Sequence, residues 1–413
     1  MQGTPDLVVR RARVVTCAGR GRPPERLGTI DDGAIAIQQG RIAWVGPDGE
    51  RPRGARELDA GGRIVLPGLV DPHTHLVFAG SRVDEFARKM AGEDYREIAR
   101  QGGGIAATVR ATRAATDEAL LASAQARALA LRAHGVTTVE IKSGYGLSVE
   151  HELRLLEIGR RLGGSGTVRT TTTLLGAHAV PPEHAACRAD YVDLVASRMI
   201  PEAASRGLAD ACDVYLDEGA FTASEARTIL EAARRAGLRL RAHVGQFRDL
   251  GGAELVAELG GLSCDHLEAV SDAGLRAMAS AGVRAVLLPA AWRTLRQTPP
   301  DAGRLRAAGV GIAIGTDLNP GTGACTDLPM AAALAVRDAG CTIEEAVLAV
   351  TVEAAAAAGL GDVGAIAPGF RADLACFDHD DPRVLGYALG GLRAAWVLLD
   401  GRELEPAAPG RIW

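Results

Sequence analysis

Apolar, β-branched runs recur along the middle of the chain and alternate with helix-like stretches rich in Ala, Arg, Glu and Leu. These runs predict strands at residues 63–70, 137–142, 169–178, 213–218, 238–243, 262–267, 283–289 and 309–317. Eight strands with helices between them are typical of an α/β fold of the (β/α)₈ TIM-type barrel class. A doubly wound open sheet is the alternative, but no Gly-x-Gly-x-x-Gly segment follows the first strand.

Both ends of the chain show a different pattern, in which short strand-like runs are separated by turns. Apolar residues alternate through 35–45, and the sequences FRADLACFD at 370–378 and AAWVLLDGREL at 394–404 repeat this character near the C-terminus. We therefore predict a small β-sandwich module built from residues 1–64 and 365–413 together. The barrel domain is then expected to span residues 65–364.

Composition and charge restrict the class of partner. The 413 residues include 46 Lys+Arg and 51 Asp+Glu, which gives a net charge of -5, and only 4% of the residues are aromatic. A nucleic-acid surface would need clustered cations and stacking rings, so we expect no nucleic-acid partner. No apolar run approaches the ~18 residues of a membrane helix, and no secretory signal is evident. The seven cysteines form no C-x-x-C pair, and together these features predict a cytoplasmic protein.

Histidines gather where the predicted strands end. Of the nine histidines, five stand at such ends: His73, His75, His178, His243 and His266. In a (β/α)₈ barrel, the carboxyl ends of the strands build the active site. This concentration of imidazoles at one edge of the barrel points to a bound metal ion.

The first two of these histidines are two residues apart, so on an extended strand both imidazoles point to the same side. His243 and the carboxylate of Asp317 would complete a set of three nitrogens and one oxygen, with room for water. An isolated His-x-His pair is as often structural as functional, but the residues on later strands favour a metal site. Zinc and iron both suit this ligand set.

Several other polar residues each allow a functional and a structural interpretation. Asp71 could orient a ligand or form an Asp-Pro turn. Lys142 could be a carbamylated ligand of a second metal or an ion-pair partner, and a single metal ion is the more economical hypothesis. Arg82 could hold a substrate carboxylate in bidentate fashion or lie on the surface. The Gly- and Asn-rich segment 316–323 could offer backbone N–H groups to an anion or be a tight loop.

Six segments together carry a resemblance to a known family: PGLVDPHTHLVFAGSR, EIKSGYGL, LLGAHAVPPE, GGAELVAELG, DHLE and TDLNPGT. Over nearly its whole length the chain resembles the imidazolonepropionases of the amidohydrolase superfamily. The His-x-His motif is common in the superfamily, whereas AGSR, SGYG and DLNPGT are more specific. The resemblance implies a barrel beside a small sheet module, one Zn²⁺ or Fe³⁺ ion per subunit, and a homodimer.

The resemblance also implies an activity, which is hydrolysis of the ring carbonyl C–N bond of 4-imidazolone-5-propanoate to N-formimidoyl-L-glutamate. One alternative is another mononuclear amidohydrolase, such as a cyclic amide or amidine hydrolase or a deaminase of a nucleobase-like ring. Arg82 and the 319–322 loop, which suit a carboxylate-bearing substrate, argue against it. A further alternative is a non-catalytic binding protein, but such a protein should have lost metal ligands.

Carried over to this chain, the family's residues acquire roles. Its metal ligands correspond to His73, His75, His243 and Asp317. Its substrate contacts correspond to Arg82, Tyr145, His178, Asn319, Gly321 and Thr322. Asp317 is then the base that takes the proton of the attacking water, and His266 orients that water and offsets charge on the carbonyl oxygen.

Gln246 stands where some members of the family carry Glu. Because an amide does not titrate near neutral pH, it cannot act as a general acid or base. We therefore expect Gln246 to hydrogen-bond the substrate ring, with proton transfer carried out elsewhere.

Overall fold

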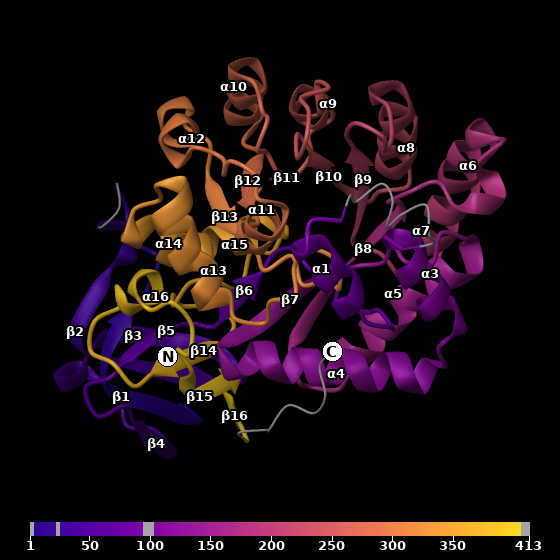
Figure 1. Ribbon diagram of the computed structural model, residues 1–413. Coiled ribbons are helices and arrows are strands. Elements are labelled where there is room, and N and C mark those ends of the chain that lie inside the picture. Colours follow the sequence, from indigo (N-terminus) through magenta and orange to yellow (C-terminus); the bar gives the residue numbers. More distant parts are fainter. Residues whose placement is uncertain (1–3, 22–24, 94–102, 406–413) are drawn as a thin grey trace.

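The computed structural model describes residues 4–21, 25–93 and 103–405, and its strands form two sheets (Figure 1). The larger unit is a barrel of parallel strands in the order β13-β12-β11-β10-β9-β8-β7-β6. Their bounds are β6 Leu69–Asp71, β7 Val136–Lys142, β8 Arg169–Ala177, β9 Ala211–Leu216, β10 Arg239–Val244, β11 Ser263–His266, β12 Arg284–Leu287 and β13 Ile312–Ile314. The predicted (β/α)₈ architecture is confirmed.

The barrel closes where the segments that follow β6 and β13 meet. Thr74 and Leu318 form a parallel bridge, and the backbone N–H of His75 donates to the carbonyl of Leu318 at 2.9 Å. Closure therefore places the His73–His75 pair directly beside Asp317, although more than half of the chain separates them.

The strands are buried because helices cover their outer faces and side chains fill the interior. All seven residues of β7 and all four of β11 are buried, as expected for parallel strands buried on both sides. The helices are α1 Val83–Met90, α3 Ile105–Ala114, α4 Asp117–Ala133, α5 Val149–Gly164, α6 Arg188–Leu194, α7 Ile200–Ser205, α8 Ala223–Arg235, α9 Gly252–Leu259, α10 Asp272–Ala281, α11 Pro289–Leu295, α12 Ala302–Ala308, α13 Leu328–Leu334, α14 Ile343–Ala349, α15 Val352–Ala357 and α16 Val384–Tyr387. Within the described ranges, none of them combines the length and apolar character of a membrane span.

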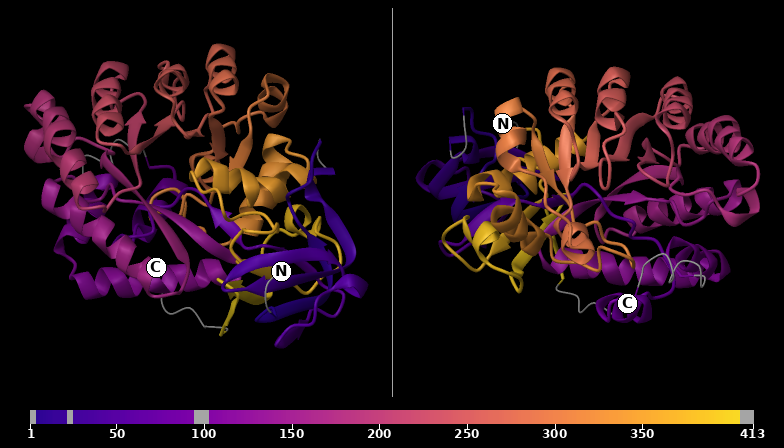
Figure 2. Two further views of the ribbon diagram at one scale, coloured as in Figure 1. Left: turned by 180° about the vertical axis from the view of Figure 1, so that it is seen from behind. Right: turned by 45° about the horizontal axis from the view of Figure 1, so that its top comes forward.

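The second unit is a mixed sheet that joins the two ends of the chain. Its strands are β1 Leu7–Val15, β2 Thr29–Gln38, β3 Arg41–Pro47, β4 Arg56–Asp59, β5 Ile64–Pro67, β14 Leu374–Phe377, β15 Ala394–Leu399 and β16 Arg402–Leu404. β14 pairs with β5, so the indigo and yellow ribbons lie side by side in both views of Figure 2. Ile35, Val65, Leu374 and Leu398 share one apolar core. The predicted composite module is confirmed, with a hydrogen-bond network that is continuous from β16 to β3.

One predicted strand proves to be two. The run 63–70 divides at Gly68 into β5, which pairs with β1 and β14 in the small sheet, and β6, which begins the barrel. Glycine is required at this point because a Cβ atom would collide with the side chain of Thr137. The small sheet therefore extends through Pro67, beyond the boundary expected at residue 64. Residues 1–3, 22–24 and 406–413 of the expected module lie outside the described residues.

Candidate metal centre

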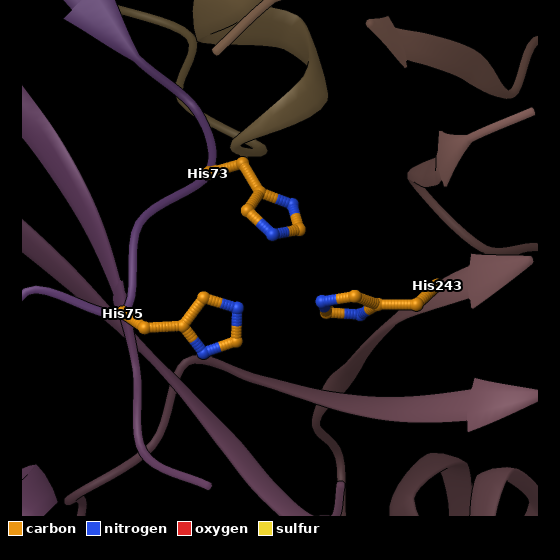
Figure 3. Close-up of side chains that lie close together, drawn as sticks. All are labelled: His73, His75 and His243. Carbon is orange, nitrogen blue, oxygen red and sulfur yellow. The ribbon is translucent and has the colours of Figure 1, made fainter. Parts of the chain in front are cut away.

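Three histidine rings converge at the carboxyl end of the barrel (Figure 3). His73 and His75 follow β6 and His243 lies in β10, and each of the three offers a ligand atom within 4.8 Å of the other two. All three are buried, and burial lowers their pKa values well below the ordinary range. The rings are therefore neutral, which is the form that binds metals.

Ring nitrogens of these histidines lack a hydrogen-bond partner in the part of the chain that the structure describes, and this indicates whether the group could bind a metal. The buried Nε2 atoms of His73 and His243 find no hydrogen-bond partner among the described residues. A buried polar atom without a partner is costly, and a metal ion would satisfy both nitrogens. The donor set fits zinc or iron.

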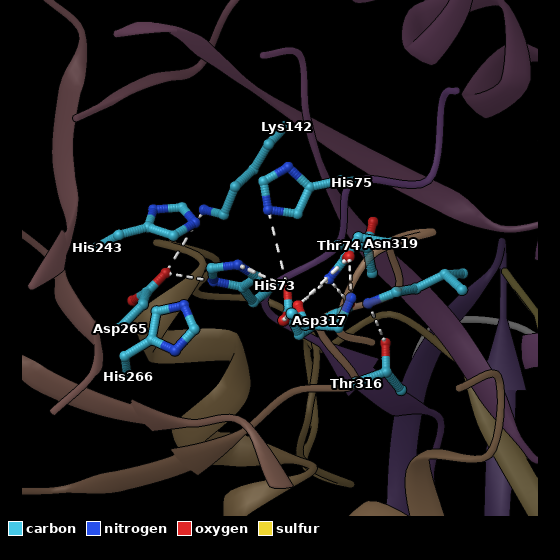
Figure 4. Close-up of polar contacts among 12 residues, drawn as sticks. His73, Thr74, His75, Lys142, His243, Asp265, His266, Thr316, Asp317 and Asn319 are labelled. Atoms are coloured by element: carbon cyan, nitrogen blue, oxygen red, sulfur yellow. Dashed lines mark hydrogen bonds and ion pairs between the residues drawn. The ribbon is translucent and has the colours of Figure 1, made fainter. Parts of the chain in front are cut away.

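Asp317 lies against the same group (Figure 4). Its Oδ1 is 3.4 Å from Nε2 of His73 and 3.7 Å from Nε2 of His75. The residue follows β13 with a φ of 52°, a left-handed conformation that is uncommon outside glycine and occurs at functional sites. Burial raises the pKa of its carboxyl to about 6.

A cavity of about 830 Å³ opens beside the three histidines. Its walls include every residue for which the sequence predicted a substrate contact: Arg82, Tyr145, His178, Gln246, Asn319, Gly321 and Thr322. His75, His243, His266 and Asp317 also line it. The fold thus brings three of the four predicted metal ligands and all the predicted substrate contacts to one cavity, with His73 directly behind them.

Arg82 immediately precedes α1 at the cavity wall. Its Nη2 lies 2.9 Å from Oε2 of Glu85, and its side chain is only 14% exposed. A Cβ atom at position 321 would lie 2.5 Å from its Nη1, so Gly321 leaves the space that the guanidinium occupies. A guanidinium held in this way is well suited to bind a carboxylate.

His178 lies just beyond β8 and stacks on His75, with ring centroids 5.0 Å apart. Its Nδ1 donates to the carbonyl of Gly144 at 3.0 Å, so its Nε2 carries the lone pair. Burial lowers the pKa of His178 to about 4, which keeps the ring neutral at pH 7. The ring of Tyr145 lies 5.5 Å away, centroid to centroid. His178 therefore offers the cavity an acceptor.

The loop after β13 uses its hydrogen-bonding groups internally. Oδ1 of Asn319 accepts from the backbone N–H groups of Gly321 and Thr322 at 2.7 and 2.8 Å. Its Nδ2 donates to the carbonyl of Asp317 at 2.6 Å, and the Thr322 hydroxyl lies 3.3 Å from Oδ2 of Asp317. Two of the N–H groups that the sequence suggested for an anion thus already donate to Asn319, whose amide nitrogen in turn donates to Asp317.

Gln246, two residues beyond β10, has its side chain fixed by Tyr215. The Tyr215 hydroxyl donates to Oε1 of Gln246 at 2.8 Å, and Asp217 accepts from the Gln246 backbone N–H at 2.7 Å. Because its carbonyl oxygen is occupied, the amide presents its NH₂ group as the remaining donor.

His266 ends β11 with a φ of 84°. Its ring lies 5.4 Å from that of His243, and its Nδ1 is 3.7 Å from a carboxylate oxygen of Glu268. Burial lowers the pKa of His266, but the negative charges of Glu268 and Asp317 outweigh it and raise the pKa overall. His266 can therefore act as a donor toward the cavity.

Known proteins share this sequence over nearly its full length. A model of the amidohydrolase family matches residues 64–403. The imidazolonepropionase of Acidiphilium cryptum is 49% identical over 381 residues, which cover 91% of this chain and 93% of that protein. The imidazolonepropionase of Geobacillus kaustophilus is 45% identical over 411 residues, covering 96% and 97%. The chain belongs to the imidazolonepropionase family.

More distant solved structures share the fold of this imidazolonepropionase-family chain. An adenosine deaminase from Xanthomonas campestris with bound zinc superposes with a TM-score of 0.72 at 21% identity, covering 97% of this chain and 93% of that one. A 5-methylcytosine deaminase from Klebsiella pneumoniae, liganded with 5-fluorocytosine, gives 0.74 at 16% identity, covering 96% and 97%. At such low identities the likeness concerns the fold alone.

In this imidazolonepropionase-family barrel, two carboxylates that the sequence did not single out stand behind the histidines. Asp265 Oδ2 lies 2.6 Å from Nδ1 of His73, and Asp213 Oδ1 lies 2.9 Å from Nδ1 of His243. Each carboxylate accepts the Nδ1 hydrogen and so turns Nε2 toward the metal position. A carboxylate inside a predicted barrel strand is the signal that could have identified both.

The structure also decides between the two readings of Asp71. Its carboxylate accepts from the hydroxyl of Thr316 at 2.6 Å, from the Thr316 backbone N–H at 3.1 Å, and from the His73 backbone N–H at 3.4 Å. Asp71 therefore joins the ends of β6 and β13 and orients the segments that carry His73 and Asp317.

Proposed function

We propose that this protein hydrolyses 4-imidazolone-5-propanoate to N-formimidoyl-L-glutamate. The observation that carries the proposal is that one cavity is lined both by a histidine and carboxylate group suited to a metal and by the guanidinium of Arg82. The first group suits hydrolysis of an amide-like bond, and the second suits a substrate with a carboxylate tail. Identities of 45–49% to imidazolonepropionases support the same substrate.

We propose that His73, His75, His243 and Asp317 hold one Zn²⁺ or Fe³⁺ ion per subunit. Such an ion lowers the pKa of a coordinated water from ~15.7 toward ~7 and so supplies a nucleophile at neutral pH. The family resemblance further supports a homodimer in the cytoplasm. Metal analysis and size-exclusion chromatography with light scattering address the ion and the dimer separately.

The proton transfers are assigned to residues of this chain. Asp317 accepts a proton from the water that attacks the ring carbonyl carbon, and returns it to the ring nitrogen as the C–N bond breaks. His266, whose pKa is raised, donates a hydrogen bond to the carbonyl oxygen while negative charge builds there. Water is the only co-reactant, so the atoms balance in N-formimidoyl-L-glutamate.

Binding of the substrate is shared among the cavity walls. Arg82 binds the propanoate carboxylate, Nε2 of His178 accepts a hydrogen bond from the ring, and Tyr145 packs beside it. The Gln246 amide donates to a ring acceptor, in the orientation that Tyr215 imposes. Asn319, Gly321 and Thr322 act through their loop, since they hold Asp317 and leave room for Arg82.

The test of this function uses purified protein of known metal content. Freshly generated imidazolonepropanoate is added, its ultraviolet absorbance is followed, and the product is identified by mass. We expect loss of absorbance together with formation of formimidoylglutamate and no release of ammonia. Absence of conversion by protein with a full metal site would contradict the proposal, and ammonia release from a nucleobase-like ring would favour a deaminase.

Replacement of Arg82 tests the carboxylate contact. We expect Arg82→Ala to raise KM about 10- to 100-fold, the loss of one charge-assisted interaction, with a smaller effect on kcat. An imidazolone that carries an uncharged alkyl chain should be hydrolysed equally by both proteins. Arg227→Ala is the matched control, because that arginine lies on α8 with Glu258 as its partner and lines no part of the cavity. Equal KM values for Arg82→Ala and the unaltered protein would exclude this contact.

A further inference from the structure

Five charged side chains are sealed inside the barrel next to the metal centre. They are Glu140, Lys142, Asp213, Arg241 and Asp265, and none is more than 1% exposed. Burial of charge is costly unless each group finds close partners. Because five buried charges are costly, we infer that they have a function that apolar side chains could not provide.

Lys142 is the residue that connects this cluster to both histidine–carboxylate pairs. Its Nζ lies 2.7 Å from Oδ2 of Asp213 and 3.5 Å from Oδ2 of Asp265. These are the two carboxylates that accept from Nδ1 of His243 and of His73. Figure 4 shows Lys142 and His73 directed at the same carboxylate of Asp265. One ammonium thus touches both carboxylates that orient metal ligands.

The remaining contacts of Lys142 reach the backbone between His73 and His75. Its Nζ lies 3.1 Å from Oε1 of Glu140, and Oε2 of Glu140 accepts from the backbone N–H of Thr74 at 3.3 Å. Arg241 is 3.4 Å from Glu140 and 3.5 Å from Asp265, so it closes the network without a contact to Asp213 within 4.0 Å. The link from the His73 side to the His243 side therefore passes through Lys142.

The surroundings of Lys142 argue against a role as a carbamylated ligand. Burial and Arg241 lower the pKa of its amine, but Asp213, Glu140 and Asp265 outweigh them and raise it. Carbamylation requires the neutral amine, and three carboxylates lie within 3.5 Å of its Nζ, where they stabilise the ammonium form. The alternative of a second metal bridged by this residue is thereby disfavoured.

Lysine is rare in this chain, which makes its presence at position 142 informative. Lys142 is one of only two lysines, beside Lys89, in a chain whose other basic residues are arginines. A compact ammonium can approach three carboxylates at once, whereas the planar guanidinium of arginine would need more room. If position 142 required only a positive charge, arginine would be expected there as at nearly all the other basic positions.

We propose that Lys142 is a positioning residue of the metal centre, whose ammonium fixes Asp213 and Asp265 so that they hold His243 and His73 with Nε2 toward the metal. This inference rests on the proposed metal site, but it adds a residue that touches neither metal nor substrate. Its consequence is a metal affinity that depends on Lys142 through the two carboxylates.

The test measures metal affinity directly, by competition with a chromophoric zinc chelator on metal-stripped full-length protein. We expect Lys142→Met to weaken zinc binding about 10- to 100-fold, as is typical for groups that orient metal ligands. Lys89→Met, which removes the only other lysine, should bind zinc as the unaltered protein does. A folded Lys142→Met protein with unaltered zinc affinity would overturn the inference, whereas failure of the unaltered protein to bind zinc would refute the proposed metal site instead.

A double variant keeps the inference testable if Lys142→Met alone does not fold. Lys142→Met combined with Asp213→Asn removes one charge of each sign from the interior. Because Lys142 acts through Asp265 as well as Asp213, we expect the double variant to bind zinc more weakly than Asp213→Asn alone, but by less than the ~10- to 100-fold expected of an independent residue. Two results would overturn the inference: zinc affinity of the double variant equal to that of the unaltered protein, or a full 10- to 100-fold loss relative to Asp213→Asn, about what an independent residue would cause. Either would show that Lys142 and Asp213 do not act together.

Discussion

Asp317→Asn should lower kcat by about 10²- to 10⁴-fold, the contribution typical of a positioned general base. The substitution preserves the size of the side chain and its contact with Thr322, but an amide cannot accept the proton of the attacking water. Steady-state kinetics with imidazolonepropanoate, on protein of measured metal content, provide the test.

Asp317 is expected to be both a metal ligand and the general base, so the loss of the ligand and the loss of the base must be measured separately. Comparison at equal metal content per chain isolates the loss of the base, and a fall in metal content isolates the loss of a ligand. Asp272→Asn serves as the matched control, since that carboxylate is exposed and pairs with Arg304 on the outside of the barrel. Turnover by a metal-loaded Asp317→Asn protein at the normal rate would refute the proposed mechanism.

Removal of the metal should abolish turnover, and addition of zinc or iron should restore it. It should also lower stability, because a ligand present at 1,000 times its dissociation constant stabilises the folded state by about 4 kcal/mol. In the metal-free protein, the buried Nε2 atoms of His73 and His243 have no hydrogen-bond partner within the described ranges. The metal-free protein should therefore have a lower free energy of unfolding than the metal-bound protein. Melting temperatures recorded with and without each metal measure this difference.

Two histidine variants separate specific metal binding from adventitious binding. His73→Ala should melt at the same temperature with and without zinc, because it lacks one of the three converging rings. His379→Ala, at an exposed position in the C-terminal part of the chain, should respond to zinc as the unaltered protein does. Full activity at less than about 0.1 ion per chain, far below a single site, would rule out metal catalysis.

Much of the candidate site could be predicted because it depends on short-range geometry. The two-residue spacing of His73 and His75 places both rings on one side of an extended segment in any surroundings. Likewise, the position of His178, His243, His266 and Asp317 at strand ends follows from the apolar runs that precede them. Once the runs are recognised as parallel strands, their carboxyl ends must share one edge.

Other features depend on close packing and could not be predicted. Beyond Arg63 the run 63–70 has no charged or polar side chain, so hydrophobicity does not reveal that Gly68 divides it between two sheets. The loop after β13 contains the residues of an anion site, but Oδ1 of Asn319 already accepts the N–H groups of Gly321 and Thr322. Composition shows which groups a loop carries, and only its folded path shows which of them are already paired.

The sequence by itself therefore determined the strand order along the chain, the family, and the side chains that converge at one end of the barrel. Tertiary structure alone decided which carboxylate supports which histidine, such as Asp265 for His73 across 192 residues of sequence. The physical reason is that orientation within a strand is set by neighbouring residues, whereas contacts across the barrel interior depend on strand register and closure. The network centred on Lys142 exists only once the strands that carry its members lie side by side.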